Sequence, residues 1–418
     1  MAQQKSLSQR EARLAFWMLA PTFLIVFAVV IFPVLANFWI SFKNVELGDL
    51  RAPTPVVRER AARAEPGEPL EVRYLMRNSS QDVTLRNVTL TAQLPAGLTP
   101  TNLPNVCAVN AQAIACDFGE WEGGYSENLE LTFQTSEAFF NSDVDPREPT
   151  RPTLNADASN ILTNFNFTLQ NFRFVLSGRE FWPVLWTTLA YTLFGTGGSI
   201  LLGLFAAQLL QGEFFGKGFL RGLFLFPYVA PVIAVAFTWT FFLDPFSGSL
   251  NALGLEFGVL REPISFLSQR SFEVSFLGLT FSLPLALSTV IAFEAWRYFP
   301  FAFLFILARF QAIPGALYES AEVDGAGAFQ KFRFITLPQL VGIVATLFLL
   351  RFIWTFNKFD DVFLLTGGAA GTETLPVQVY DNAFGRSDIG AGAATAVVLF
   401  FILAIFLVFY FRYTPEGD

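Results

Sequence analysis

The stretch ESAEVDGAGAFQKFRFITLP, residues 319–338, is a polar segment that lies between two long apolar runs. It contains three acidic and two basic side chains, and it closes with Leu-Pro. A plain connector between two apolar segments does not need such a composition. What the stretch does depends on what surrounds it, so the flanking sequence has to be interpreted first.

The composition of the chain favours a membrane protein. Charged residues make up 15% of the 418 residues and hydrophobic residues 53%, whereas a soluble protein carries about 25% charged residues. There is no His and there are only two Cys, which excludes catalysis or metal binding by His and leaves too few ligands for a zinc site. We therefore expect no catalytic residue, no metal and no cofactor in this chain.

Apolar runs of membrane-spanning length recur along the sequence. A bilayer core needs about 20 mostly apolar residues per helix. Six windows reach or approach that length, and they are 16–40, 184–210, 220–243, 283–308, 340–356 and 391–410. The fifth is short and is expected to extend backwards through Phe334 and Ile335. The predicted fold class is an all-α polytopic membrane protein with six transmembrane helices.

The basic residues predict the orientation of these spans, because cytoplasmic segments carry an excess of Lys and Arg. With six spans, four basic regions fall on the same side. Their residues are Lys5, Arg10 and Arg13; Lys217 and Arg221; Arg309, Lys331 and Arg333; and Arg412. Both termini are therefore expected in the cytoplasm. A cleaved signal peptide is the alternative for the first span, but its run of about 25 residues exceeds the usual 7–15.

Residues 46–165 form a different kind of segment, predicted to lie outside the membrane between the first two spans. Residues 46–157 contain 17 acids and nine Arg, which accounts for the whole net charge of −8. Alternating stretches such as LEVRYLMRN predict strands, with a β-sandwich core at about 66–137 and Pro-rich linkers on both sides. Cys107 and Cys116 bracket a hairpin loop, where either a disulfide or two free thiols fits. The strand region resembles the immunoglobulin-like domains of bacterial surface proteins.

Residues 312–338, which include the opening stretch, fall on the cytoplasmic side between the fourth and fifth spans. The sequence predicts one short helix up to Val323, an interruption at Gly325 and Gly327, and a second helix leading to Pro338. Such a bent element has the shape to enter a groove on a soluble partner. An amphipathic helix that only connects two spans is the alternative.

The same stretch resembles the EAA motif of permease subunits of binding-protein-dependent ABC importers. The positions that match the motif at its spacing are Glu319, Ala321, Gly325, Ile335, Leu337 and Pro338, while Ser320 replaces the middle Ala. Further stretches, such as LFLFPYVAPVIAVAFTWTFFLDP and FNKFDDVFLLTGGAAGTETLP, resemble the maltose- and glycerol-phosphate-type branch of the family. The resemblance covers nearly everything except residues 45–165.

This resemblance implies a subunit that forms a pathway for a carbohydrate and hydrolyses no ATP itself. Its EAA segment, including Asp324, would couple it to a dimer of ATP-binding subunits. A second permease subunit, distinct rather than identical, and an external sugar-binding protein would complete the importer in the bacterial inner membrane. The sequence has no Walker motif, which agrees with ATP being bound by a partner. No nucleic-acid partner is expected.

The division of the chain that follows has three parts. Residues 1–45 hold the cytoplasmic N-terminus and the first span, residues 46–165 the external insertion, and residues 166–418 a five-helix permease core that includes the coupling segment 312–338.

Polar side chains at membrane depth are costly and often line a pathway. Glu294 and Arg297 are three residues apart and share a helix face, so they are expected either to pair with each other or to face substrate. Aromatic rings and planar polar groups suit sugars. The candidate substrate residues are Glu294, Trp296, Arg297, Trp354, Asn357 and Asp360, although a membrane-interface aromatic belt also explains the Trp residues.

Two other classes of protein remain as alternatives. A secondary transporter needs no ATPase, but it has no use for an EAA segment. A membrane-anchored surface protein would display the strand region, but it needs only one span.

Overall fold

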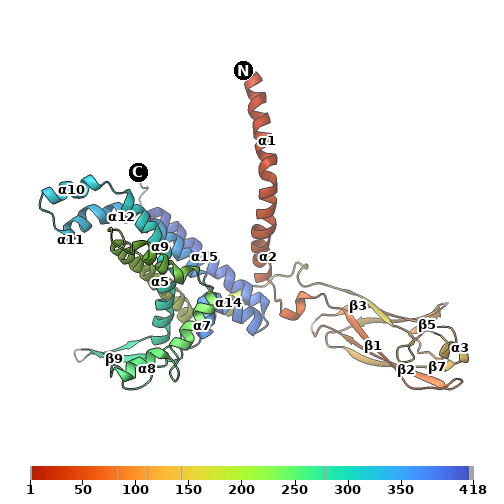
Figure 1. Cartoon of the computed structure of the whole chain (residues 1–418). Coiled ribbons are helices and arrows are strands. Elements are labelled where there is room, and N and C mark those ends of the chain that lie inside the picture. Colours follow the sequence, from red (N-terminus) through yellow and green to blue (C-terminus); the bar gives the residue numbers. More distant parts are fainter. Residues whose placement is uncertain (1, 82, 111, 143, 277–278, 414–418) are drawn as a thin grey trace. The chain divides into compact units, whose positions relative to one another are not determined.

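The computed structural model describes residues 2–81, 83–110, 112–142, 144–276 and 279–413. Contacts within the chain divide it into two compact units. We call Met1–Ser41, Asn171–Arg386 and Ala391–Asp418 the helical unit, and Phe42–Gln170 with Ser387–Gly390 the β unit. Figure 1 shows both, coloured along the sequence.

The helical unit contains the apolar spans that the sequence predicts. Its elements in chain order are α1 (Ala2–Val26), η1 (Phe27–Ile31), α2 (Phe32–Ser41), α4 (Gln170–Ser177), α5 (Phe181–Leu209), α6 (Lys217–Val229), α7 (Val232–Phe242), α8 (Ser249–Glu256), β9 (Phe272–Phe276), β10 (Leu279–Leu283), α9 (Leu285–Ala312), α10 (Gly315–Val323), α11 (Ala328–Lys331), η3 (Phe332–Thr336), α12 (Leu337–Phe356), α13 (Asp360–Thr366), α14 (Leu375–Tyr380), η4 (Asp381–Gly385) and α15 (Ile389–Tyr413). Here α4 and α15 each begin with residues of the β unit.

Among the described residues, five helical stretches are long and apolar enough to cross a membrane, and α6 with α7 makes a sixth if the two count as one span. The fifth predicted span does extend backwards, because the helix is continuous over Ala328–Phe356 and includes Phe334 and Ile335. The prediction of several apolar spans is therefore confirmed, with five or six as the number.

The third predicted span is bent instead of straight. Helices α6 and α7 meet at 95°, and the break falls at Ala230 and Pro231. Pro231 has no N–H to continue a helix, and a proline forces the residue before it out of the helical region. Ala230 accordingly has extended backbone angles, with ψ at 143°. The bend exposes the carbonyl end of α6 to the neighbouring helix α9.

Helices α5 and α9 approach each other closely because glycines of α5 face α9. A Cβ placed on Gly203 would lie 2.8 Å from the backbone N of Phe303 and 3.0 Å from the carbonyl O of Phe299. A Cβ on Gly195 would lie 2.8 Å from Cγ of Glu294. Small residues at such crossings let membrane helices pack through their backbones. This packing fixes the position of Glu294 relative to α5.

The β unit consists of two four-stranded antiparallel sheets. Its strands are β1 (Pro55–Ala61), β2 (Pro69–Asn78), β3 (Leu85–Gln93), β4 (Leu98–Asn102), β5 (Cys107–Asn110), β6 (Ala113–Trp121), β7 (Ser126–Thr135) and β8 (Thr153–Ala158), with η2 (Leu47–Leu50) and α3 (Glu137–Phe140) beside them. The strand orders are β1-β2-β7-β4 and β5-β6-β3-β8. Buried residues of both sheets form one core, which includes Tyr74, Leu90, Trp121 and Phe133.

Strands β1 and β8 lie outside the predicted core of 66–137, in the segments that the sequence predicts as linkers. Those flanks are strands, not linkers. The carboxylate of Glu59 explains part of this, because it is buried and accepts hydrogen bonds from N and Oγ1 of Thr150 and from N of Arg151. The contact ties β1 to the start of β8. Prolines are tolerated at the first residue of an edge strand, which is where Pro55 stands.

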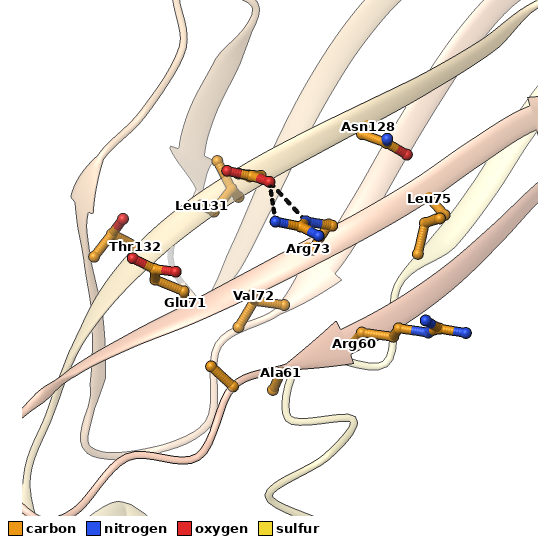
Figure 2. Close-up of a pocket in the computed structure, with 11 residues that line it drawn as sticks. Arg60, Ala61, Glu71, Val72, Arg73, Leu75, Asn128, Leu131 and Thr132 are labelled. Carbon is orange, nitrogen blue, oxygen red and sulfur yellow. Dashed lines mark hydrogen bonds and ion pairs between the residues drawn. The ribbon is translucent and has the colours of Figure 1, made fainter.

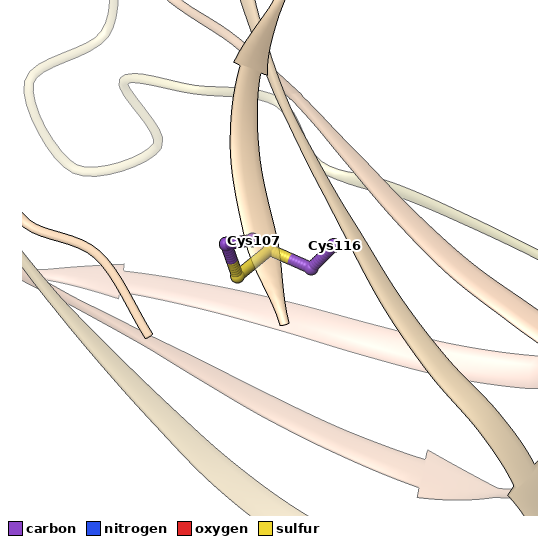
Figure 3. Close-up of a disulfide and its surroundings, with 2 residues drawn as sticks. All are labelled: Cys107 and Cys116. Atoms are coloured by element: carbon purple, nitrogen blue, oxygen red, sulfur yellow. A yellow bond between two sulfur atoms is a disulfide. The ribbon is translucent and has the colours of Figure 1, made fainter. Parts of the chain in front are cut away.

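Cys107 and Cys116 form a disulfide between β5 and β6 (Figure 3). The two residues are direct partners in the antiparallel register, so the bridge closes the hairpin that the sequence predicts between them. It lies within the β unit.

Candidate functional site: a coupling segment and a buried polar cluster

The segment between α9 and α12 is a pair of short helices with a sharp bend, as Figure 1 shows for α10 and α11. Pro314 caps α10, which ends at Val323. Gly325 adopts φ of +81°, a left-handed conformation that residues with a Cβ rarely adopt. Helix α11 then begins at Ala328, and the side chain of Gln330 accepts a hydrogen bond of 2.8 Å from N of Gly327.

Two contacts hold the bend closed. Nζ of Lys331 lies 2.6 Å from Oε1 of Glu322 across it, and this ammonium holds the pKa of Glu322 below its usual value. The hydroxyls of Tyr318 and Thr336 lie 2.9 Å apart. The bend is therefore a defined shape within the helical unit and not an open loop.

The outer surface of this segment is apolar as well as charged. Val323 is 89% exposed just before the bend and Phe329 is 74% exposed just after it. The motif residues Glu319, Asp324 and Gly325 are also exposed. A surface that combines exposed Phe and Val with acids at a fixed bend has the features of a protein-docking site.

The remaining predicted coupling residues lie at the ends of the segment. Ala321 is half-buried on α10, Ile335 is half-buried within the π-helical turn η3, and Leu337 and Pro338 are exposed at the start of α12.

A buried carboxylate connects three helices of the helical unit. Glu294 on α9 is fully buried. Its Oε1 accepts from Nη2 of Arg351 and, at 2.8 Å, from Oγ1 of Thr355, both on α12. Its Oε2 accepts from the hydroxyl of Tyr191 on α5 at 3.1 Å. Arg351 is itself only 3% exposed, so this is a buried ion pair.

Tyr298 lies at the centre of a wider group of charges. Its ring is covered by three cations, with centroid distances of 4.1 Å for Arg351, 4.6 Å for Lys358 and 5.5 Å for Arg297. Nζ of Lys358 also donates to the Tyr298 hydroxyl. We call Glu294, Arg297, Tyr298, Arg351, Lys358, Asp360 and Asp361, together with Tyr191 and Thr355, the polar cluster.

Lys358 connects this cluster to α13. Its Nζ lies 3.3 Å from Oδ1 of Asp360 and 3.9 Å from Oδ2 of Asp361. Asp361 is fully buried, whereas the Asp360 side chain is 41% exposed. The cluster therefore runs from a buried interior to a partly open end at α13.

Arg297 and Glu294 do not pair with each other. The predicted pairing of these two residues is wrong, because Glu294 forms its ion pair with Arg351 on α12. Arg297 instead donates from Nη2 to the carbonyl O of Ala230, at 3.1 Å, and from Nε to the Tyr298 hydroxyl, at 3.3 Å. Residues separated by three positions share one face of a helix, but the residue on the neighbouring helix that faces them decides which charges pair.

The aromatic candidates separate into two groups. Trp296 packs against Trp239, with ring centroids 5.4 Å apart, and against Phe293 at 6.4 Å. It is therefore partly buried in the apolar interior of the helical unit. Trp354 is 46% exposed and packs on Phe301.

Asn357 is exposed as well, and its side chain donates to the carbonyl O of Ile353 on its own helix. Trp354 and Asn357 are thus not brought to the polar cluster, whereas Glu294, Arg297 and Asp360 belong to it, and Trp296 packs in an aromatic group with Trp239 and Phe293.

Sequence reasoning missed Arg351, Tyr191, Tyr298 and Thr355. Arg351 carried a usable signal, since it is a lone charge inside an apolar run, and an ionisable residue at that depth is a functional candidate with a partner. Tyr191, Tyr298 and Thr355 gave no such signal, because Tyr and Thr are frequent in membrane helices.

The β unit has a shallow depression of about 340 Å³ over the outer face of β1, β2 and β7 (Figure 2). An exposed ion pair crosses it, with Nη2 of Arg73 2.6 Å from Oε1 of Glu130. The residues that the structure describes around it include no aromatic ring, so it lacks the stacking surface that suits a sugar. The polar cluster is the better candidate for a ligand.

Comparison with known proteins identifies the family. Residues 199–414 match the family described as "Binding-protein-dependent transport system inner membrane component". The chain is 38% identical over 251 residues to the inner membrane ABC transporter permease protein YcjO of Escherichia coli, covering 60% of this chain and 80% of that protein. It is 32% identical over 245 residues to the trehalose/maltose transport system permease protein MalF of Thermococcus litoralis, covering 58% of this chain and 78% of that protein.

A solved structure agrees on the fold. A bacterial ABC transporter involved in the import of the acidic polysaccharide alginate contains a chain that matches with a TM-score of 0.50 at 22% identity, over 60% of this chain and 86% of that one. The family match includes the coupling segment and the polar-cluster residues from Glu294 to Asp361. On this evidence the chain belongs to the inner membrane components, the permease subunits, of binding-protein-dependent ABC transport systems.

Proposed function

We propose that this chain carries a carbohydrate across the membrane as one permease subunit of an ABC importer. The polar cluster is the main observation that supports this proposal, because it places hydroxyls and charged groups of α5, α9, α12 and α13 inside an apolar helical unit. Polar groups at that depth are costly and mark substrate pathways. The similar permease of T. litoralis is named for trehalose and maltose, which supports a sugar as the class of substrate.

The segment 312–338 would couple this pathway to ATP hydrolysis. The chain itself would bind no ATP and no other cofactor, and a separate dimer of ATP-binding subunits would receive α10 and α11. The exposed Val323 and Phe329 support this role, because they offer an apolar surface beside the acids Glu319 and Asp324. A second, distinct permease subunit and an external binding protein complete the proposed importer.

The orientation of the chain follows from its basic residues. Both termini and the coupling segment would lie in the cytoplasm, and the β unit would lie outside the cell's inner membrane. We assign the β unit to the immunoglobulin-like class, on the support of its two antiparallel sheets and their common core. It would either dock a partner or hold one at a distance.

Reconstitution tests the proposal. The purified chain alone in proteoliposomes should hydrolyse no ATP, whereas the chain with its ATPase, its second permease and its binding protein should show hydrolysis that sugar stimulates and uptake that needs ATP. Uptake driven by an ion gradient, without any ATPase, would instead identify a secondary transporter. Hydrolysis by the chain alone would overturn the division of labour.

A further inference from the structure

The polar cluster contains equal numbers of basic and acidic side chains, but not every basic side chain lies within ion-pair distance of an acidic one. The cluster holds three cations and three carboxylates. Glu294 and Arg351 pair with each other, and Lys358 lies within 4 Å of both Asp360 and Asp361. Arg297 has no carboxylate within ion-pair distance among the residues that the structure describes.

Arg297 is nevertheless buried. It is 6% exposed, and its Nη1 has no hydrogen-bond partner in the described part of the chain. Its two hydrogen bonds go to neutral acceptors, the carbonyl O of Ala230 and the hydroxyl of Tyr298. A buried guanidinium without an anion is costly. The carbonyl end of α6 offsets part of this cost, because a helix C-terminus carries a partial negative charge.

Asp361 is the acidic residue of the cluster that lacks a close basic partner, since Nζ of Lys358 is 3.9 Å from it. Asp361 is fully buried, and no N–H and no Ser, Thr or Tyr hydroxyl of the described residues donates to its carboxyl oxygens, although the carboxyl group of Glu294 lies within hydrogen-bonding reach of it. The cluster thus offers one unsatisfied donor at Arg297 and, at Asp361, a carboxyl group that receives no N–H or hydroxyl from the described residues, and Tyr298 and Lys358 link the two residues. A ligand that carries both hydroxyls and an anionic group satisfies both ends.

We propose that the substrate of this importer is an acidic saccharide, whose carboxylate or phosphate pairs with Arg297 while its hydroxyls hydrogen-bond to the carboxyl group of Asp361. This rests on the proposed function and narrows its substrate class. Guanidinium groups suit carboxylate and phosphate oxygens because they present parallel N–H donors. Trp296, which precedes Arg297 in α9, and Trp239, which packs on it, would supply the rings that cover the apolar face of a sugar.

Transport by the complete reconstituted importer tests the proposal with matched pairs of sugars. The probes are a digalacturonate and the neutral disaccharide with the same linkage, and a glycerol phosphate and glycerol. The first pair offers a carboxylate and the second a phosphate, so the two arms distinguish the sources of the anion. We expect ATP-dependent uptake of an anionic member and no uptake of its neutral counterpart.

Variants of Arg297 identify the residue responsible. Arg297→Gln should lower uptake of the anionic probe about 10- to 100-fold, the range that one hydrogen bond to a charged group supplies, and Arg297→Lys should restore part of it. The change should appear in KM for the anionic probe. Arg261→Gln, the same substitution at an exposed residue outside the cluster, should leave uptake unchanged.

Each outcome separates this inference from the function on which it rests. Uptake of neutral sugars alone would overturn the acidic substrate and leave the sugar importer standing. Uptake of an anionic probe that Arg297→Gln does not lower, although the variant is inserted at normal yield, would also overturn it. ATP-stimulated uptake of none of the sugars would overturn both.

Discussion

Removing the cation from the buried pair of Glu294 and Arg351 should be among the most damaging single changes in the helical unit. Arg351→Leu leaves the carboxyl group of Glu294 fully buried, with the hydroxyls of Thr355 and Tyr191 as its neutral hydrogen-bond donors in the described part of the chain. Removing one partner of a buried pair costs about 3–5 kcal/mol. We expect a loss of that size in the stability of the purified chain.

The assay is thermal unfolding in detergent, followed by intrinsic fluorescence. The control is Arg386→Leu, because Arg386 pairs with Glu180 at 3.5 Å where both side chains are more than half exposed, and an exposed pair contributes at most about 1 kcal/mol. Arg351→Leu should lower Tm clearly, and Arg386→Leu should hardly change it.

A double variant makes the argument refutable. Glu294→Met with Arg351→Leu removes both charges at similar volume, so it should recover at least half of the loss, because no uncompensated charge remains. If the double variant is as unstable as Arg351→Leu alone, the buried charge is not the cause. If Arg351→Leu melts together with Arg386→Leu, the pair is not buried in the protein as it exists in detergent.

The other predictions concern three separate features. Gly203→Ala should weaken the packing of α5 on α9, because the new Cβ would lie 2.8 Å from the backbone N of Phe303. The control is Gly197→Ala on the same helix, whose Cβ would have no atom within 4 Å. We expect a lower Tm for Gly203→Ala alone, and equal Tm values for the two variants would contradict this packing. Gly325→Val should leave membrane insertion intact but strain the backbone of the bend by about 1–2 kcal/mol, because φ there is +81° and an L residue is strained at such angles. We expect ATP hydrolysis that sugar no longer stimulates, whereas the control Gly315→Ala, at an open position with ordinary φ, should behave as the parent. Normal sugar uptake by Gly325→Val would exclude the coupling role. Replacing Cys107 and Cys116 together by Ser opens a loop with a separation of nine residues, which should destabilise the β unit by about 2–3 kcal/mol; the readout is faster proteolysis within residues 46–165, and unchanged digestion rates would mean that the bridge contributes nothing.

The sequence by itself determined the class of protein and most of its elements. Apolar runs report membrane spans directly, because a helix must satisfy its own backbone in lipid and needs about 20 residues to cross it. Alternation reported the strands of residues 66–137 for a similar reason, since side chains of a strand alternate between core and solvent. The glycine between α10 and α11 marked a bend because only glycine adopts that backbone conformation freely.

The sequence did not show what depends on partners far apart in the chain. Charge and proline content predicted linkers on both sides of the strand region, but these flanks contain strands β1 and β8. A hydrogen bond between Glu59 of β1 and Thr150, which precedes β8, joins the two flanks across 91 residues of sequence. Spacing along one helix suggested that Glu294 pairs with Arg297, whereas packing of α12 on α9 gave it Arg351. The bend at Pro231 brought the carbonyl of Ala230 to Arg297. The periodicity of a sequence indicates which face of an element is buried, but only tertiary packing decides which side chain lies opposite that face. The polar cluster forms because packing brings polar residues of α5, α9, α12 and α13 together.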